Sequence, residues 1–402
     1  MKFSRLSLVA MAALATLSSN AFAADNLADA FKNGKVAGEI RAYYFSRDIP
    51  NDHQGHEDIF ASGLMLNYVT DNFMGFRAGA TFQSSATPFV DDDGKTMFRR
   101  DMWAQGAQFS EAYLAYALGK TDVKVGRMYM GTPLIAGSGS RLIRESFEGA
   151  LITNKDIPDT TLGAVYIDKF QARTNKEGDI GEFEDYYDGM YSLYAINKSI
   201  AGLTLTGAWA YINDDNTLDS NLNIYNLEAI YANKIGAFGY NLGAQYWLND
   251  YSSVSAGEDD SIYGYGLKAG ASYANLSGYV AYSKISDDDN TPMGQLLHGA
   301  GNGTDLIYTA SIIGSYSYYA DMKAYAAGLD YKINPSTNVG TVYVATTHDA
   351  NFAIDADVSY TGFYASYSFS GALKGLSVVA QYETIGKDAD GDQFRFKGSY
   401  KF

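Results

Sequence analysis

The last ten residues, QFRFKGSYKF, alternate strictly between two kinds of side chain. One parity carries the aromatic residues and a glycine, and the other carries the basic residues and a serine: Phe394, Phe396, Gly398, Tyr400 and Phe402 against Arg395, Lys397, Ser399 and Lys401. Successive side chains of a β-strand point to opposite faces, so this segment is predicted to be a strand with one apolar and one polar face. The same period of two runs through most of the chain after Val36, and only DNLADAF near the start has a helical pattern.

Eighteen segments of the chain are predicted to be strands on this basis. They are 35–47, 58–70, 72–84, 108–119, 121–130, 147–154, 159–172, 187–198, 202–212, 222–233, 237–248, 261–274, 276–284, 321–333, 336–347, 356–369, 375–385 and 392–402. Most are about ten to fourteen residues long, the length that a tilted strand needs to cross a bilayer. A tight turn follows each even-numbered strand and a longer, mostly acidic loop follows each odd-numbered one, which is typical of outer-membrane barrels.

A sheet that crosses lipid must close on itself, because lipid cannot hydrogen-bond to the free N–H and C=O groups of an edge strand. With an even number of strands, the last strand can pair with the first, VAGEIRAYYF, and close the sheet. The predicted fold is therefore an all-β, transmembrane antiparallel β-barrel with short periplasmic turns and long extracellular loops. The alternative, a soluble secreted β-sandwich or β-solenoid, is disfavoured by the strand lengths, the alternating loop lengths and the lack of a fixed-period repeat.

The start of the chain has the pattern of a secretory signal peptide. Lys2 and Arg5 precede the apolar run LSLVAMAALATL, and a small-residue motif ends at Ala23. The expected organisation is a signal peptide at 1–23, a short periplasmic segment at 24–34 and a barrel at 35–402. The chain has no cysteine, and its net charge of −16 becomes about −18 without the two leader cations, which excludes nucleic acid as a partner.

The chain contains 34 tyrosines, and tyrosine suits a membrane–water boundary because its ring is apolar and its hydroxyl is polar. A girdle of rings is expected beside the short turns, formed by Tyr68, Tyr231, Tyr240, Tyr273, Tyr331, Phe369 and Phe402. The expected surroundings of the barrel are therefore the lipid and lipopolysaccharide of a bacterial outer membrane.

A barrel of about eighteen strands is too wide for side chains to fill, so a water channel is expected along its axis. The inward parity predicts a basic pore wall made of Arg41, Arg77, Lys124, Lys268, Lys332, Arg395, Lys397 and Lys401, with Glu39 beside them. A single lysine on a wet wall needs no function, but three bases in one strand beside Arg41 form a cluster. Fixed charges of one sign attract the opposite ion, so small anions such as carboxylates are expected to follow this wall.

The third long connection, GTPLIAGSGSRLIRES, is glycine-rich and apolar at its start, unlike the acidic loops. An apolar loop is costly in water, so residues 131–146 are predicted to fold inward as the pore constriction. Ser140, Arg141, Arg144 and Glu148 are the residues expected there. The alternative is a surface loop whose arginines pair with Glu145 or Glu148.

Other chemistry has weaker support in the sequence. A barrel enzyme needs a histidine with a positioned acid and usually a nucleophile, but His53, His56, His298 and His348 all fall in predicted loops and no Gly-x-Ser-x-Gly motif occurs. An adhesive or structural barrel would need a plugged lumen, and no plug domain is recognisable. The acidic runs Asp91, Asp92, Asp93 and Asp287, Asp288, Asp289 are weak candidates for Ca²⁺, and no other cofactor is expected.

The central part of the chain resembles the OprD-type outer membrane porins. The residues that carry this resemblance are Lys124-Val125-Gly126, Ser140-Arg141-Leu142, Phe147-Glu148-Gly149 and Thr153 to Asp159. The start of the mature chain, FKNGKVAGEIRAYYFSRD, is similar to the first strand of that family and also to the major outer membrane porins of epsilonproteobacteria. Where family loops commonly read S-R-L-L-P, this chain has Ser-Arg-Leu-Ile-Arg, so Arg144 replaces a proline.

The resemblance implies an eighteen-strand channel with an inward third loop and a basic ladder on its wall, of a kind that passes amino acids and small carboxylates. Arg141, Arg395 and Lys397 lie where such a ladder and constriction would be. OprD-type channels are often monomers and the epsilonproteobacterial porins are trimers, so both states stay open. A general cation-selective porin, dominated by the acidic loops, is the alternative function.

Overall fold

The computed structural model describes residues 24–49, 55–213, 220–252, 254–255, 258–288, 290–304, 307–314, 318–347 and 357–402. The predicted signal peptide, His53, Asp289 and His348 lie outside these residues. Within them, none of the helices has the length and apolar character that crossing a membrane requires.

The described chain forms one closed antiparallel sheet of eighteen strands. The strands are β1 (Lys35–Asp48), β2 (His56–Val69), β3 (Phe76–Ser85), β4 (Gly106–Leu118), β5 (Thr121–Met128), β6 (Ser146–Asn154), β7 (Thr160–Gln171), β8 (Phe183–Asn197), β9 (Leu203–Ile212), β10 (Leu222–Ile235), β11 (Phe238–Tyr251), β12 (Ser261–Tyr273), β13 (Leu276–Ile285), β14 (Lys323–Asn334), β15 (Thr337–Thr347), β16 (Val358–Ser368), β17 (Leu376–Lys387) and β18 (Gly391–Lys401). Each corresponds to one predicted strand, so the barrel and its strand number are confirmed.

The largest differences between prediction and structure come from local backbone geometry. β3 begins at Phe76 rather than at residue 72, because Met74 and Gly75 have φ of 53° and 91° and form a turn in which the Asn72 side chain accepts a hydrogen bond from Gly75 N at 2.8 Å. β8 begins four residues earlier than predicted, at Phe183. Its pairing with β7 shifts register near Ile167, and Tyr187 in this part of β8 has φ of 52°, an irregularity that breaks the alternation in the sequence.

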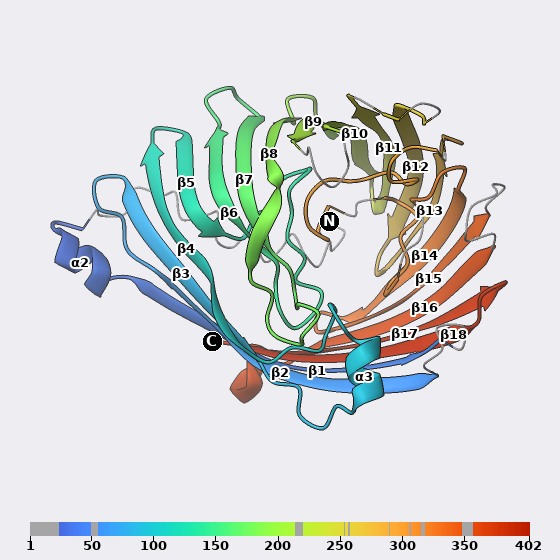
Figure 1. The fold of residues 1–402 in the computed structure, drawn as a ribbon, viewed down its shortest axis with the longest axis horizontal. Helices are drawn as coiled ribbons and strands as arrows, with labels where there is room; N and C mark the ends of the chain where they lie inside the picture. The colour runs from blue at the N-terminus through green and yellow to red at the C-terminus, as the bar shows by residue number, and fades with distance from the viewer. Residues whose placement is uncertain are drawn as a thin grey trace.

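Pairing of β18 with β1 closes the barrel (Figure 1). Phe402 N donates to Gly38 O at 3.0 Å, and Gly38 N donates to Phe402 O at 2.9 Å. A Cβ on Gly38 would lie 2.3 Å from the ring of Phe402, so a larger residue at position 38 would displace that ring. The alternating final strand therefore removes the last free edge of the sheet.

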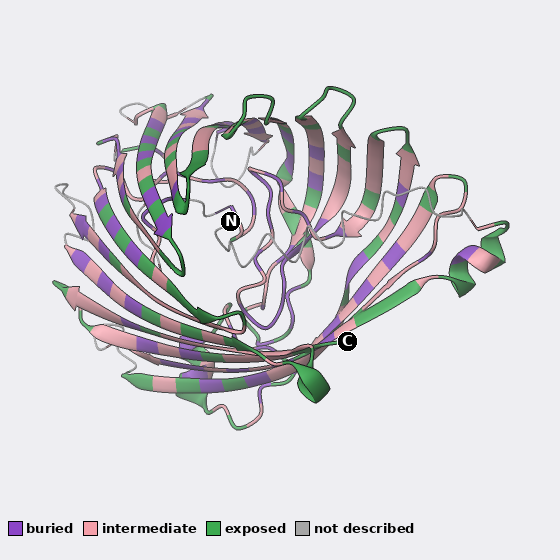
Figure 2. Cartoon of the chain, turned by 180° about the vertical axis from the view of Figure 1, so that it is seen from behind, coloured by how far each residue is buried: buried purple, intermediate pink, exposed green. Residues whose placement is uncertain are grey.

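The two faces of the strands differ as the sequence predicts (Figure 2). In β1, Ile40 is 52% exposed on the outer face, whereas Phe45 is fully buried on the inner face. The rings expected beside the short turns share the outward parity, and Tyr273, Tyr331 and Phe402 are exposed there. The outer wall is thus an apolar surface suited to lipid.

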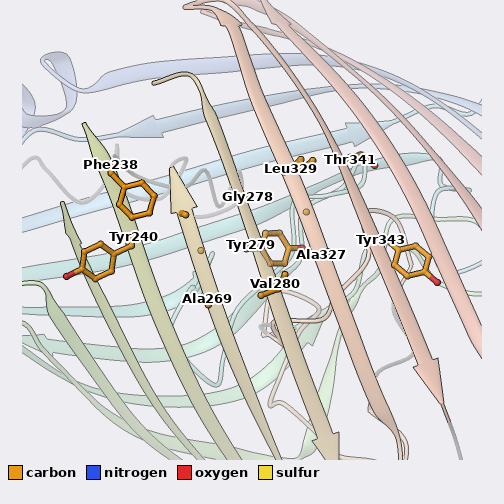
Figure 3. Close-up of a pocket in the computed structure, with 13 residues that line it drawn as sticks. Phe238, Tyr240, Ala269, Gly278, Tyr279, Val280, Ala327, Leu329, Thr341 and Tyr343 are labelled. Carbon is orange, nitrogen blue, oxygen red and sulfur yellow. The ribbon is translucent and has the colours of Figure 1, made fainter. Parts of the chain in front are cut away.

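The outer wall also carries an apolar groove of about 730 Å³ over β11–β15 (Figure 3). Small residues such as Ala269 and Ala327 line it between larger side chains, of which Phe238, Leu329 and Tyr343 are exposed. The groove belongs to the lipid-facing side of the sheet and is separate from the lumen.

Two α-helices and one 3₁₀-helix accompany the described strands: α2 (Leu27–Lys32), α3 (Asp92–Met97) and η2 (Gly371–Leu373). α2 matches the predicted helical segment. α3 was not predicted, because its sequence DDGKTM carries a glycine and a run of acids. Asp91 caps this helix by accepting a hydrogen bond from Gly94 N, and Asp92 pairs with Lys95 at 2.7 Å. These two candidate Ca²⁺ ligands therefore stabilise a helix end, where acidic side chains are favourable.

Candidate functional site: the lumen and its constriction

The loop 131–146 folds into the barrel, as the sequence predicts (Figure 1). Its apolar start provides the reason, because Leu134 and Ile135 are fully buried in the large hydrophobic cluster on the inner side of the sheet. Its second half is held by polar side chains of the wall. Gln83 of β3 bonds both the N–H and the C=O of Arg144 at 3.0 Å, and Arg41 of β1 donates to Leu142 O at 2.8 Å.

The described residues of a second long connection, 286–322, also enter the lumen. Within its described part, Ala300 exchanges backbone hydrogen bonds with the first inward loop: Ala136 N to Ala300 O at 3.0 Å and Ala300 N to Leu134 O at 2.9 Å. Further along, Ile312, Ile313 and Gly314 donate their backbone N–H groups to the carboxylate of Glu383 on β17. This loop therefore rests on the first inward loop and on the barrel wall, which the sequence did not predict.

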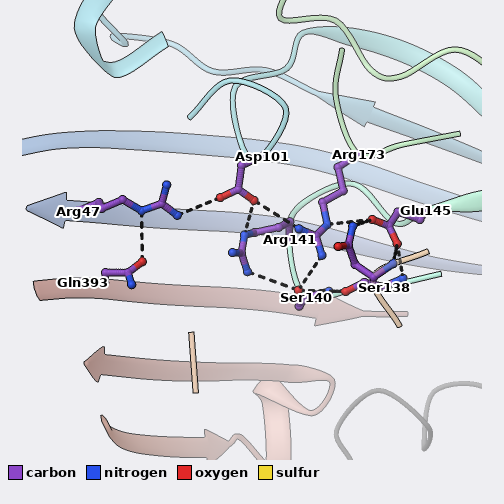
Figure 4. A network of polar contacts seen from close by, with 9 residues as sticks. Arg47, Asp101, Ser138, Ser140, Arg141, Glu145, Arg173 and Gln393 are labelled. Carbon is purple, nitrogen blue, oxygen red and sulfur yellow. Dashed lines mark hydrogen bonds and ion pairs between the residues drawn. The ribbon is translucent and has the colours of Figure 1, made fainter. Parts of the chain in front are cut away.

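A network of opposite charges surrounds Asp101, which lies after α3 in the loop 86–105 (Figure 4). Its carboxylate accepts from Arg141 Nε at 2.5 Å and from Arg47 Nη2 at 3.2 Å, and Arg173 Nη1 lies 3.5 Å away. The three arginines come from different segments: the constriction loop, β1 and the connection 172–182. Tertiary structure alone brings them together.

The surrounding arginines determine the ionisation state of Asp101. Burial by itself would raise the pKa of this carboxyl group, but Arg141, Arg47 and Arg173 together lower it to about 2. Asp101 is therefore a carboxylate at any physiological pH, and it neutralises part of the positive charge around it.

The bases of β1 and β18 form a ladder along the inner wall. Register places Arg47 opposite Gln393, Phe45 opposite Arg395, and Tyr43 opposite Lys397. The guanidinium groups of Arg47, Arg141 and Arg395 lie 4.8, 5.2 and 5.8 Å from the centre of the Phe45 ring. Three cations thus lie close to one buried aromatic ring, a favourable arrangement of charge and π-system.

Two members of this ladder, Arg395 and Lys397, form no ion pair with an acid among the described residues. Arg395 is 3% exposed; its Nε donates to Gln381 at 2.9 Å, but its buried Nη1 has no hydrogen-bond acceptor. Lys397 Nζ lies 6.0 Å from the Tyr43 ring and within electrostatic range of Arg395, Arg141 and Arg41. Arg41 itself pairs with Glu39 at 2.8 Å.

The other predicted wall residues do not gather at this place. Arg77 pairs with Asp122 at 3.2 Å, and Lys124 lies over the Tyr113 ring. Lys268 lies over Tyr279, on strands opposite β1 in the barrel (Figure 1). Lys332 and Lys401 are exposed at strand ends beside the short turns, so they belong to the periplasmic rim rather than to the constriction.

Only some of the predicted constriction residues lie inside the lumen. Arg141 and Ser140 lie in the Asp101 network, and Arg144 lies over the Tyr129 ring at 4.2 Å. Glu148 does not lie with them. It pairs with Arg127 at 2.8 Å on the outer face of the sheet, on the same parity as exposed Ile152. The prediction for Glu148 is wrong, because β6 already begins at Ser146 and the alternation turns residue 148 outward.

Sequence reasoning missed Asp101, Arg47, Arg173 and Glu145 as parts of this site. Glu145, named only as a partner for arginines of a surface loop, is fully buried and lies 3.4 Å from Arg173 Nε. Arg47 was detectable, since it continues the inward parity of Arg41. The loop residues had no such signal, because loops lack the period of two.

The histidines and acids of the described residues do not form a metal-binding group. No set of three or more His, Cys, Asp or Glu side chains there gathers as metal ligands would. His298, which falls in a predicted loop, is buried between Trp247 and Tyr318, at ring-centroid distances of 4.7 and 3.9 Å. Its Nε2 has no hydrogen-bond partner, and burial lowers its pKa to about 3.

Comparison with known proteins agrees with this architecture. The family model described as "outer membrane porin, OprD family" matches residues 29–402. No curated protein matches the chain. Among solved structures, Pseudomonas aeruginosa OccK9 (OpdG) superposes with a TM-score of 0.80 at 17% identity, and Acinetobacter baumannii OccAB2 with 0.78 at 18%. Each comparison covers 93% of this chain and 99% of the other.

Pseudomonas aeruginosa OpdK, solved with vanillate, has a TM-score of 0.76 at 15% identity, covering 92% of this chain and 99% of that one. At such low identities, the superpositions establish the fold alone. The family model, in contrast, covers nearly all of the described chain. The chain therefore belongs to the OprD family of outer membrane porins and is a channel of the bacterial outer membrane.

Proposed function

We propose that this porin carries small carboxylates, including amino acids, across the outer membrane by passive diffusion. The observation that carries the proposal is the basic ladder formed by Arg47, Arg395, Lys397 and Arg41 on the inner faces of β1 and β18, with Arg141 beside it. These side chains descend the wall at every second residue, a spacing of about 7 Å. A carboxylate can therefore move from one cation to the next without losing contact with positive charge.

The unpaired part of the ladder supports this class of solute. Arg395 Nη1 is a buried donor without an acceptor, and a buried unsatisfied charged group is costly. A carboxylate would satisfy it with a charge-assisted hydrogen bond. OpdK, which has the same fold, was solved with vanillate, and vanillate is a carboxylate.

A general cation-selective porin is the second candidate. The whole chain has a net charge of −16, and exposed loop acids such as Asp92 would attract cations to the mouth. The two candidates differ in which charges control flux: those at the mouth or those on the wall of the constriction.

The deciding measurement is the reversal potential of the refolded protein in a planar bilayer under a KCl gradient at neutral pH. A chloride-selective potential, together with block of the current by benzoate, supports the carboxylate channel. A potassium-selective potential without benzoate block supports the cation-selective porin and overturns the ladder as the determinant of flux.

A further inference from the structure

Asp101 occupies the place where an incoming carboxylate would make its best contacts. It bonds Arg141 at 2.5 Å and Arg47 at 3.2 Å, and Arg173 is 3.5 Å away (Figure 4). These are the contacts that arginines make with a bound carboxylate ligand. Three cations at the constriction are thus already engaged by an anion of the protein itself.

The position of Asp101 is fixed rather than incidental. Phe98 and Met102 flank it and are 0% and 1% exposed, packed in one cluster with Phe45 and Leu142. Asp101 N and Met102 N both donate to Phe98 O, at 3.1 and 3.0 Å. Arg100, just before it, has φ of 60°, an unfavourable region for a side chain other than glycine. The loop therefore holds Arg100 in an unfavourable backbone conformation, and the Asp101 carboxylate that follows points toward the arginines.

The charges of the cluster show what Asp101 changes. Asp101, Glu39 and Glu145 face six bases, namely Arg41, Arg47, Arg141, Arg173, Arg395 and Lys397. Without Asp101, Arg47 and Arg141 would have no carboxylate partner among the described residues. An unbalanced cluster of buried arginines would hold an anion tightly, yet a conducting channel must also release it.

We propose that Asp101 is a built-in competitor for the solute carboxylate, which sets how tightly the constriction binds an anion and how quickly it releases it. This inference rests on the proposed function. It makes Asp101 a residue that determines the anion specificity of the same site. The solute binds at Arg395 and Lys397, which form no ion pair with an acid among the described residues, and passes Arg141 without being trapped, because Asp101 competes for that guanidinium.

The test compares Asp101→Asn with Asp92→Asn in the full-length refolded channel, using benzoate as the probe. Both substitutions remove one negative charge from the same loop, but Asp92 pairs with Lys95 on the exposed face of α3, whereas Asp101 pairs with Arg141 and Arg47. Single-channel recordings give the benzoate dwell time, and reversal potentials give the chloride-to-potassium permeability ratio. Only folded channels insert and conduct, and Asp101→Glu provides a variant that keeps the charge.

We expect Asp101→Asn to lengthen the benzoate dwell time about tenfold, the order of effect of one charge-assisted hydrogen bond, and to raise the anion permeability ratio. Asp92→Asn and Asp101→Glu should change the dwell time less than about twofold. If Asp101→Asn and Asp92→Asn give the same benzoate dwell time, or if Asp101→Asn weakens benzoate binding, Asp101 only stabilises the loop structure and the inference is wrong. If wild-type channels and Arg395→Gln channels bind benzoate equally weakly, the proposed function itself fails.

Discussion

The carboxylate of Glu145 in the first inward loop accepts a hydrogen bond from the backbone N–H of Asn302 in the second, at 2.9 Å. The same carboxylate accepts from Ser138 N at 2.8 Å and lies near Arg173. One fully buried acid therefore joins two loops that are 157 residues apart in the chain. Because both loops enter the lumen, we expect its width to depend on this contact.

Replacing Glu145 by alanine should separate the two loops, since it leaves Arg173 and two backbone donors without this acceptor. We expect a larger and noisier single-channel conductance than that of the wild type. Glu148→Ala is the matched control, because Glu148 is three residues away but faces outward. Equal conductance in both variants would contradict the role of Glu145.

Replacing Arg395 by glutamine should lower anion preference, because Arg395 is the buried ladder cation whose Nη1 lacks an acceptor. We expect benzoate affinity to fall about tenfold or more, the effect of losing a charge-assisted hydrogen bond. Lys332→Gln removes the same charge from the periplasmic rim and should change affinity little. Titration of the benzoate block in planar bilayers measures both, and an equal loss in the two variants would mean that overall charge rather than position controls binding.

Acid should destabilise the protein through His298. An unfolded histidine has a pKa of about 6.5, and burial lowers the pKa of His298 to about 3. The stabilising contribution of the neutral ring is therefore complete above pH 6.5 and is lost as the pH falls toward 3. Relative to the wild type, His298→Phe should gain up to about 1.4 kcal/mol in unfolding free energy for each pH unit below 6.5.

Urea unfolding of both proteins at pH 7 and pH 5 measures this difference, since the remaining groups titrate alike in the two. His56→Phe serves as the control, because His56 is exposed at the start of β2. A His298→Phe difference that does not change with pH would show that protonation of His298 does not oppose folding.

Deleting Phe402 should weaken the closure of the barrel. It removes the backbone pair with Gly38 and the ring that packs on it. We expect the folded, heat-modifiable species on gel electrophoresis to unfold at a lower temperature than in the wild type. Tyr331→Ala removes another exposed ring of the girdle without touching the closure; an equal shift in that variant would assign the effect to lipid contact instead.

Much of the fold was predictable because the pleat of a strand repeats every two residues. That period identified all eighteen strands and the inward parity of Arg41, Arg395 and Lys397. The apolar sequence at Leu134 and Ile135 likewise identified a loop that avoids water. In each case the evidence is local, since a few neighbouring residues show which side faces lipid, water or protein.

The constriction, in contrast, was decided by tertiary structure. Asp101 meets Arg47, Arg141 and Arg173 only because three loops and one wall strand converge inside the barrel. Loops have no fixed period, so their side-chain directions follow from where Phe98, Ile135 and Ala300 find apolar cover. The sequence by itself determined the wall of this channel, whereas closure of the barrel determined which charges face one another across its lumen.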